Sequence, residues 1–186
     1  MRRRARAKAE PPGAEAALEI AARFLGTRPR SRWEVERRLQ RARASDQVME
    51  ATLERLARLG LVDDLAFSRW WVEQRDRHAP RGRRLVEAEL RQHGVGREVI
   101  ELLRNELATL EVEALASDDA EADLPATEEA RARIALDRHL RGRPLPEDPE
   151  AVQRLGMFLM RRGFDPETAR AALRERKADQ SQQDED

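Results

Sequence analysis

The sequence predicts an all-α protein made of three tandem three-helix repeats, each similar to a helix-turn-helix, in an elongated and curved arrangement. Ala, Leu, Arg and Glu dominate its 186 residues and Tyr is absent, a composition typical of helices. Apolar residues recur three and four positions apart, the period of a buried helix face. A short turn after a middle helix occurs three times, at Arg43, Gly94 and Gly163. Because three short helices bury little surface alone, neighbouring repeats are expected to stack.

The first repeat shows how the helices are assigned. An apolar stripe at helical spacing predicts a helix over residues 14–25. Ser31 and Glu34 then form a capping box, in which each side chain can bind the backbone amide of the other residue. The second helix therefore begins just after Ser31, and Gly60 is expected to end the third.

The remaining helices are assigned from polar residues that can cap their first turns. A carboxylate or hydroxyl at this position accepts hydrogen bonds from free backbone amides, and negative charge there is favourable. Residues of this kind precede five apolar stripes: Ser45 or Asp46, Asp63–Asp64, Thr127, Asp148 and Asp165. Asp148 is followed by proline, which suits the first position of a helix.

These boundaries divide the chain into six segments. They are a flexible basic arm (1–12), the first repeat (13–60), the second repeat (61–115), an acidic linker (116–126), the third repeat (127–177) and a disordered polar tail (178–186). The acidic linker explains why the second and third turns lie further apart than the first and second.

The tryptophans are divided between core and surface. Phe67, Trp70 and Trp71 share one helical stripe and are predicted to lie in the core. Trp33 is the aromatic residue expected to be exposed, and an exposed ring could stack on a nucleic-acid base.

No catalytic or metal-binding pattern is present, so we predict a protein that is not an enzyme and needs no cofactor or metal. Cysteine is absent, and His78, His93 and His139 lie on different predicted helices without metal-ligand spacing. Capping of a helix explains Asp63–Asp64 without a metal. The acidic linker lacks the glycine and the spacing of a calcium loop.

Charge is unevenly distributed along the chain. Residues 1–110 carry 24 basic and 17 acidic residues, whereas residues 111–186 carry 12 and 19, so the two parts have net charges of +7 and −7. A basic part of this kind favours a polyanion or an acidic protein as partner. No apolar run is long enough to cross a membrane and no secretion signal is evident, so we expect a cytoplasmic protein.

Two arginine clusters are the candidate binding residues. The first surrounds the middle helix of the first repeat: Arg28, Arg30, Arg32, Arg37, Arg38, Arg41 and the neighbouring Arg43. The second lies at the break before the middle helix of the second repeat: Arg75, Arg77, Arg81, Arg83 and Arg84. Arg83 and Arg84 stand at a helix start, where free amides also favour anions.

Three ordered motifs resemble those of the RecX family. Residues 28–39, RPRSRWEVERRL, resemble its R-x-x-S-x-x-E-L-x-x-K/R-L signature. Residues 56–67, LARLGLVDDLAF, resemble L-x-x-x-G-h-h-D-D-x-x-F-A, where h is apolar, and residues 80–95, PRGRRLVEAELRQHGV, resemble G-P-x-x-I-x-x-E-L-x-x-K-G-I. The resemblance is specific over about residues 14–107, and the last repeat resembles the family only in its helix pattern. Three positions depart from the family pattern: His93 replaces lysine, Arg43 replaces glycine and Ser68 replaces alanine.

The resemblance implies a curved molecule of tandem repeats whose partner is the RecA recombinase filament. Members of the family bind the groove of the RecA–DNA filament and modulate, usually inhibit, its strand exchange and ATPase activities. It thus implies contacts with RecA and with DNA, single- or double-stranded and without sequence preference, by a monomer. Two alternatives stay open: a stand-alone helix-turn-helix transcriptional regulator, and a scaffold that binds a protein through its acidic C-terminal part.

Overall fold

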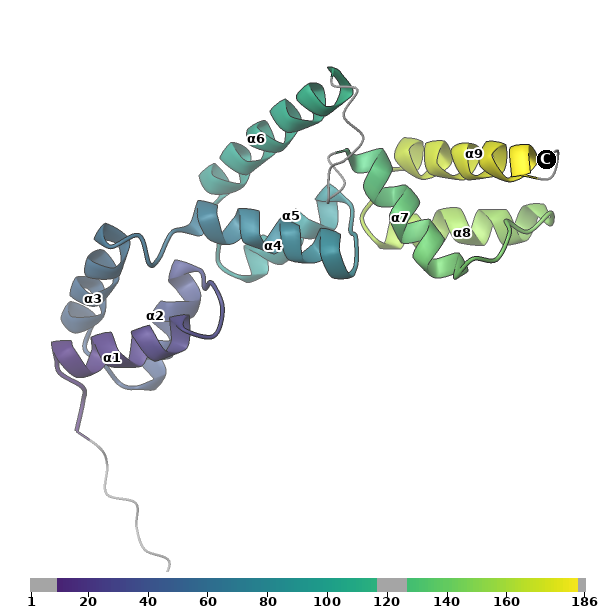
Figure 1. Ribbon diagram of the computed structural model, residues 1–186. Helices are drawn as coiled ribbons and strands as arrows, with labels where there is room; N and C mark the ends of the chain where they lie inside the picture. The colour runs from purple at the N-terminus through teal and green to yellow at the C-terminus, as the bar shows by residue number, and fades with distance from the viewer. Residues whose placement is uncertain (1–9, 117–126, 184–186) are drawn as a thin grey trace, which may run out of the picture. The chain divides into compact units, whose positions relative to one another are not determined.

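The computed structural model describes residues 10–116 and 127–183, and all regular structure within these ranges is helical (Figure 1). The helices are α1 (Ala14–Leu25), α2 (Arg32–Arg41), α3 (Asp46–Arg58), α4 (Asp64–His78), α5 (Arg83–Gln92), α6 (Arg97–Ala116), α7 (Glu128–Leu140), α8 (Pro149–Arg161) and α9 (Pro166–Gln183). They follow one another as three sets of three, which confirms the predicted all-α fold of tandem three-helix repeats. The chain divides into an N-terminal unit (residues 10–67 and 93–95) and a C-terminal unit (68–92, 96–116 and 127–183).

In the N-terminal unit, α1 packs on both α2 and α3 around a small apolar core. Alanines on α1 allow the helices to approach closely, and larger side chains of α2 and α3 fill the remaining space. The core consists of Ala17, Ala21, Val35, Leu39, Ala44, Met49, Leu53, Leu56 and Val62. These are the positions that the apolar periodicity of the sequence assigns to the inner faces.

The first half of the C-terminal unit contains the rest of α4 together with α5 and α6. Its buried apolar side chains include Val72, Val86, Leu90, Ile100 and Leu103, which come from all three helices. The helices of the second repeat therefore also share a core.

The prediction that Phe67, Trp70 and Trp71 form one core stripe is correct for Phe67 and wrong for the two tryptophans. Phe67 is buried, whereas Trp70 and Trp71 are half-buried. The buried face of α4 continues instead through Ser68, Val72 and Asp76, four residues apart. The prediction from the spacing of the aromatic rings failed because the polar side chains of Ser68 and Asp76 occupy the inner face of α4.

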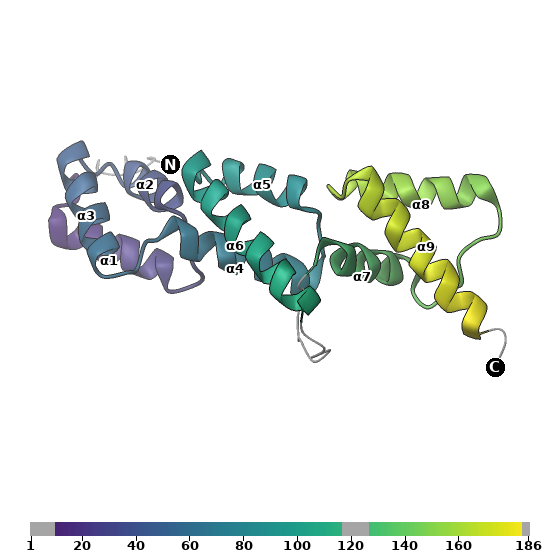
Figure 2. The ribbon, with the colours of Figure 1, turned by 90° about the horizontal axis from the view of Figure 1, so that it is seen from above.

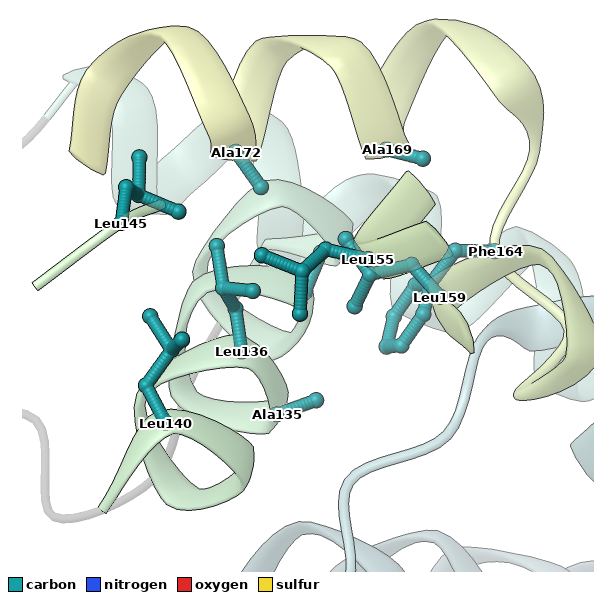
Figure 3. Packing of buried hydrophobic residues seen from close by; sticks show 10 residues of the cluster. Ala135, Leu136, Leu140, Leu145, Leu155, Leu159, Phe164, Ala169 and Ala172 are labelled. Carbon is teal, nitrogen blue, oxygen red and sulfur yellow. The ribbon is translucent and has the colours of Figure 1, made fainter. Parts of the chain in front are cut away.

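In the last repeat, α7, α8 and α9 lie against one another in both views (Figures 1 and 2). Their core is centred on Leu136, Leu155, Leu159 and Phe164, whose side chains point toward one another (Figure 3). Alanines of α9, among them Ala172, contribute the facing surface, so that the longer helix packs closely. This repeat therefore has an apolar core of its own, although it follows the acidic linker in the sequence.

The turns that follow the middle helices have one backbone conformation. Arg43, Gly94 and Gly163 all have positive φ, at 64°, 77° and 90°. This left-handed conformation suits glycine, and Arg43 adopts it without being glycine. The three positions aligned from the sequence are therefore structurally equivalent turns.

The predicted caps are present. The Ser31–Glu34 capping box is complete, and the side chains of Ser45, Thr127 and Asp148 accept hydrogen bonds from the first turns of α3, α7 and α8. One boundary differs: α9 continues to Gln183, so residues 178–183 are helical rather than part of a disordered tail. Residues 1–9 of the arm, 117–126 of the linker and 184–186 of the tail lie outside the described residues.

None of the helices within the described ranges is long and apolar enough to cross a membrane. These ranges also contain no group of three or more His, Asp or Glu side chains placed to hold a metal ion.

Candidate partner-binding surface

The arginines nearest the start of α2 are held by one carboxylate. Arg28 Nη2 lies 2.5 Å from Glu34 Oε1, and Arg30 Nη1 lies 3.7 Å from the same oxygen. The Arg30 guanidinium also stacks 4.0 Å from the centre of the Phe24 ring. Burial, followed by the positive charge of Arg28, lowers the pKa of Arg30. These two arginines therefore hold the turn between α1 and α2.

The arginines further along α2 face outward. Arg32 pairs with Glu50 on α3 at 2.9 Å, and Arg37 stacks 4.6 Å from the centre of the Trp33 ring. Arg38 and Arg41 are exposed, and no carboxylate among the described residues pairs with them. Their positive charges are thus available to a partner.

The second cluster is organised around a buried carboxylate on α5. Glu89 is 7% exposed and receives hydrogen bonds from Arg75 Nε and from Trp71 Nε1, each at 2.8 Å, on one oxygen. Arg81 pairs with its other oxygen. Burial lowers the pKa values of Arg75 and Arg81. A buried carboxylate of this kind needs its cations, so both arginines are structural.

Arg83, at the start of α5, has a similar role. Its Nη2 lies 2.8 Å from both Glu111 oxygens, and its backbone amide donates to Glu128 Oε1 at 2.9 Å. Burial works to lower the pKa of Arg83, but the hydrogen bond and charge of Glu111 outweigh it and raise the pKa overall. Arg83 therefore ties α5 to α6 and to the start of α7.

Two arginines of the second cluster are exposed. Arg77 pairs with Glu73 one turn earlier on α4, at 2.6 Å, and an exposed pair of this type is weak. Arg84 has no pairing carboxylate among the described residues. Of the twelve arginines in the two clusters, the exposed ones are therefore Arg37, Arg38, Arg41, Arg43, Arg77 and Arg84.

The three sequence motifs meet in the N-terminal unit. The Ser31 hydroxyl donates to the carbonyl oxygen of His93 at 2.5 Å while also capping α2. The backbone amide of Arg32 donates to Asp64 Oδ1 at 2.8 Å, and a Cβ on Gly94 would lie 2.4 Å from Trp33 Cβ. We call these six residues, Ser31, Arg32, Trp33, Asp64, His93 and Gly94, the first docking cluster. The paired aspartates have separate roles, because Asp63 caps α4 and Asp64 binds the start of α2.

A second docking cluster lies in the C-terminal unit and consists of Gly82, Leu85, Glu128, Arg162 and Gly163. The Gly82 amide donates to the Arg162 carbonyl at 2.9 Å. A Cβ on Gly163 would lie 2.4 Å from Leu85 Cβ, and one on Gly82 would lie 2.2 Å from Gly163 backbone atoms. Glu128 completes the cluster by binding the amide of Arg83. The turn before α9 therefore packs against the start of α5.

One buried ion pair beside this cluster joins residues that no sequence motif connects. Arg131 Nε lies 3.0 and 3.1 Å from the two oxygens of Asp76, and the side chains are 7% and 5% exposed. Burial raises the pKa of Asp76, although the Arg131 charge opposes this shift. Asp76 lies on α4 and Arg131 on α7, 55 positions apart, so helical periodicity could not pair them. The one available signal was a charged residue on the inner face of each helix.

Comparison with known proteins places these repeats in one family. The chain matches the RecX first three-helix domain over residues 17–56, the second over 63–102 and the third over 127–173. It is 36% identical to the regulatory protein RecX of Thermobifida fusca, over 89% of this chain and 85% of that protein. It is 37% identical to that of Mycolicibacterium vanbaalenii, over 81% and 77%.

Solved structures agree in fold. A crystal structure of RecX from Lactobacillus salivarius superposes with a TM-score of 0.67 at 14% identity, covering 89% of this chain and 97% of that one. A second crystal structure, of a regulatory protein RecX, gives 0.61 at 20% identity over 83% and 70%. The third repeat, assigned from caps and spacing, is confirmed by its own family match. The chain belongs to the RecX family of regulatory proteins.

Proposed function

We propose that this protein binds the RecA recombinase filament, in its groove and together with DNA, and mostly inhibits its recombinase and ATPase activities. Membership of the family supports the partner. The observation that carries the binding mode is the set of exposed arginines on α2, where Arg38 and Arg41 have no pairing carboxylate among the described residues. Cations of this kind attract phosphate and carboxylate groups from solution.

The protein acts in the cytoplasm as a monomer and contacts DNA without sequence preference, because its exposed arginines meet the backbone rather than base edges. The family matches give no support to the alternative of a stand-alone helix-turn-helix transcriptional regulator.

The test compares two pairs of arginines in equivalent helix positions. Arg38 and Arg41 occupy the last turn of α2, and Arg55 and Arg58 occupy the last turn of α3. The DNA-dependent ATPase rate of the cognate recombinase is measured against increasing protein. Wild type is expected to inhibit, and R38E/R41E to need about tenfold more protein, since each reversed contact repels a phosphate or carboxylate.

R55E/R58E carries the same change in charge on α3 and should inhibit like wild type. An unchanged ATPase rate at stoichiometric excess of wild-type protein would contradict the proposed function. Equal losses in both variants would assign the effect to overall charge rather than to α2.

A further inference from the structure

A hollow on the C-terminal unit has a lining rich in cations. Four arginines contribute, namely Arg138, Arg141, Arg143 and Arg162, and the remaining lining residues are His78, Ala79, Ala135 and His139. The hollow encloses about 480 Å³, and none of these lining residues is acidic. We call it the basic hollow. It lies where α4 and α7 end and where α8 ends.

The guanidinium groups of the basic hollow are positioned without being neutralised. Three of them donate to backbone carbonyl oxygens: Arg138 to Arg77 at 3.1 Å, Arg143 to Leu140 at 3.0 Å and Arg162 to Pro80 at 3.2 Å. A carbonyl oxygen carries only a partial charge, so each guanidinium keeps most of its positive charge. Arg75 and Arg81 differ, since both pair with the Glu89 carboxylate.

The carboxylate nearest in sequence is engaged elsewhere. Asp137 precedes Arg138 on α7, and its Oδ1 lies 3.2 Å from Arg176 Nε on α9. The cations of the basic hollow are therefore pre-positioned for an anion from outside, and binding would immobilise few side chains.

The backbone conformation of Arg141 independently indicates that the basic hollow has a binding role. It ends α7 in the left-handed conformation, with φ of 53°, directly before Gly142 at 78°. This conformation is unfavourable for a long side chain and is usually occupied by glycine or asparagine. Arginine at this position costs folding free energy, and a binding role for its charge would explain why it is there.

A second hollow continues the same surface. It shares His139 and Arg143 with the basic hollow, and Phe158 and Arg161 also line it. The His139 ring stacks on Phe158, with ring centres 4.0 Å apart and planes inclined by 26°. Cations beside a flat aromatic and apolar surface suit a strand that alternates phosphates with bases. An acidic peptide would use only the cations.

We propose that the basic hollow binds backbone phosphates of a nucleic-acid strand, whose bases lie toward Phe158. The inference deepens the proposed function and rests on it for the setting, namely a recombinase filament that contains DNA. Net charge concealed this surface: residues 111–186 are acidic overall, yet residues 127–163 carry eight basic and six acidic residues.

The test removes three charges and keeps the local structure. In R138Q/R141N/R143Q, the glutamine amide at position 143 stands where Arg143 Nε donates to the Leu140 carbonyl, and asparagine tolerates the left-handed conformation at position 141. The exposed side chain at position 138 loses its hydrogen bond to the Arg77 carbonyl, because glutamine is too short to reach it. The control, R133Q/R170Q/R174Q, removes the same charge from exposed arginines of the same repeat that do not line the hollow. Binding to fluorescein-labelled oligothymidylate is measured by fluorescence anisotropy from about 50 to 200 mM salt.

The hollow variant is expected to bind the oligonucleotide about tenfold more weakly at the lowest salt. The slope of log affinity against log salt should become shallower by about 2, since each lost single-strand phosphate contact removes about 0.7. The control should stay within about twofold of wild type. Equal affinities for all three proteins, or equal losses in both variants, would overturn the proposal.

Recombinase ATPase inhibition by the same proteins separates this proposal from the proposed function. If wild type inhibits and the hollow variant binds DNA normally, the basic hollow is wrong and the function stands. If wild type fails to inhibit but the hollow variant loses DNA binding, the basic hollow stands and the function is wrong. If the hollow variant loses inhibition but retains DNA binding, the surface meets an acidic protein and the nucleic-acid proposal is overturned.

Discussion

The two docking clusters have one geometry and different chemistry. In the first, the amide of Arg32 at the start of α2 donates to Asp64 at the start of α4. In the second, the amide of Arg83 at the start of α5 donates to Glu128 at the start of α7. Each cluster also places a positive-φ glycine against the first turn of the same middle helix. In both clusters, the start of the middle helix of one repeat forms the surface on which another segment docks.

The side chains that hold the two clusters differ in charge. Apart from the Asp64 carboxylate, the first relies on the uncharged Ser31 hydroxyl and on the Trp33 side chain against Gly94. The second uses a backbone amide from Gly82 and is flanked by buried ions, among them the Asp76–Arg131 pair. The motifs by which the family is identified thus largely describe how repeats dock, whereas the arginines available to a partner lie outside these contacts.

Breaking the buried ion pair should have the largest effect on stability. Arg131→Met leaves the Asp76 carboxylate buried and unpaired, and we expect the free energy of unfolding to fall by about 3–5 kcal/mol. Urea denaturation of the full chain measures this. The double variant R131M/D76L should regain most of the loss, because apolar side chains replace both charges. A loss below about 1 kcal/mol in R131M would show that the pair does not hold the second cluster.

Filling the glycine contacts should have the next largest effect. In Gly82→Ala the new Cβ would overlap the backbone of Gly163, which has no side chain to move, so we expect a loss of about 2–3 kcal/mol. Gly96→Ala meets open space and should cost less than about 1 kcal/mol. Thermal unfolding followed by circular dichroism compares the two. Similar losses in both would mean that backbone packing is not what joins α5 to the last repeat.

The sequence could predict local features such as caps and turns, but not contacts between residues that are far apart along the chain. The caps formed by Ser31 and Thr127 and the turn at Gly163 depend on neighbouring residues, so residue types and spacing were sufficient to place these helices and turns. The long-range contacts of Ser31 with His93 and of Gly163 with Leu85 have no such local pattern. The sequence predicts Arg83 as a partner contact and does not indicate its bonds to Glu111 and Glu128, because these carboxylates lie 28 and 45 positions away. An arginine cluster looks the same in sequence whether its charges face solvent or buried glutamates, and the fold alone distinguishes these cases.

The first docking cluster can be weakened at Ser31 alone. Ser31→Ala removes a helix cap and also the hydrogen bond to the His93 carbonyl, and we expect a loss of about 2 kcal/mol. Ser45→Ala removes a cap only and should cost about 1 kcal/mol. The difference between the two, measured by urea denaturation, isolates the docking contact. Equal losses would indicate that Ser31 serves only α2.

The smallest expected effect is the pH dependence of stability that Asp76 causes. It tests whether buried charges hold the second cluster. Burial raises its pKa in the folded protein above the unfolded value of about 4, and Arg131 offsets this shift only in part. The folded state therefore gains a proton first as pH falls. Relative to D76N, wild type should gain stability as pH falls through the raised pKa, by up to about 1 kcal/mol per pH unit.

The contribution of Asp165 to stability should have the opposite pH dependence. Hydrogen bonds from backbone amides, first that of Thr168, lower its pKa in the folded protein. Its stabilisation is present above the unfolded pKa and is lost as pH falls through the folded one, so wild type should lose its advantage over D165N below about pH 4. Urea denaturation at several pH values compares both variants with wild type. If wild type instead lost stability relative to D76N on acidification, the attraction of Arg131 would outweigh burial, and the second cluster would be held by its charges.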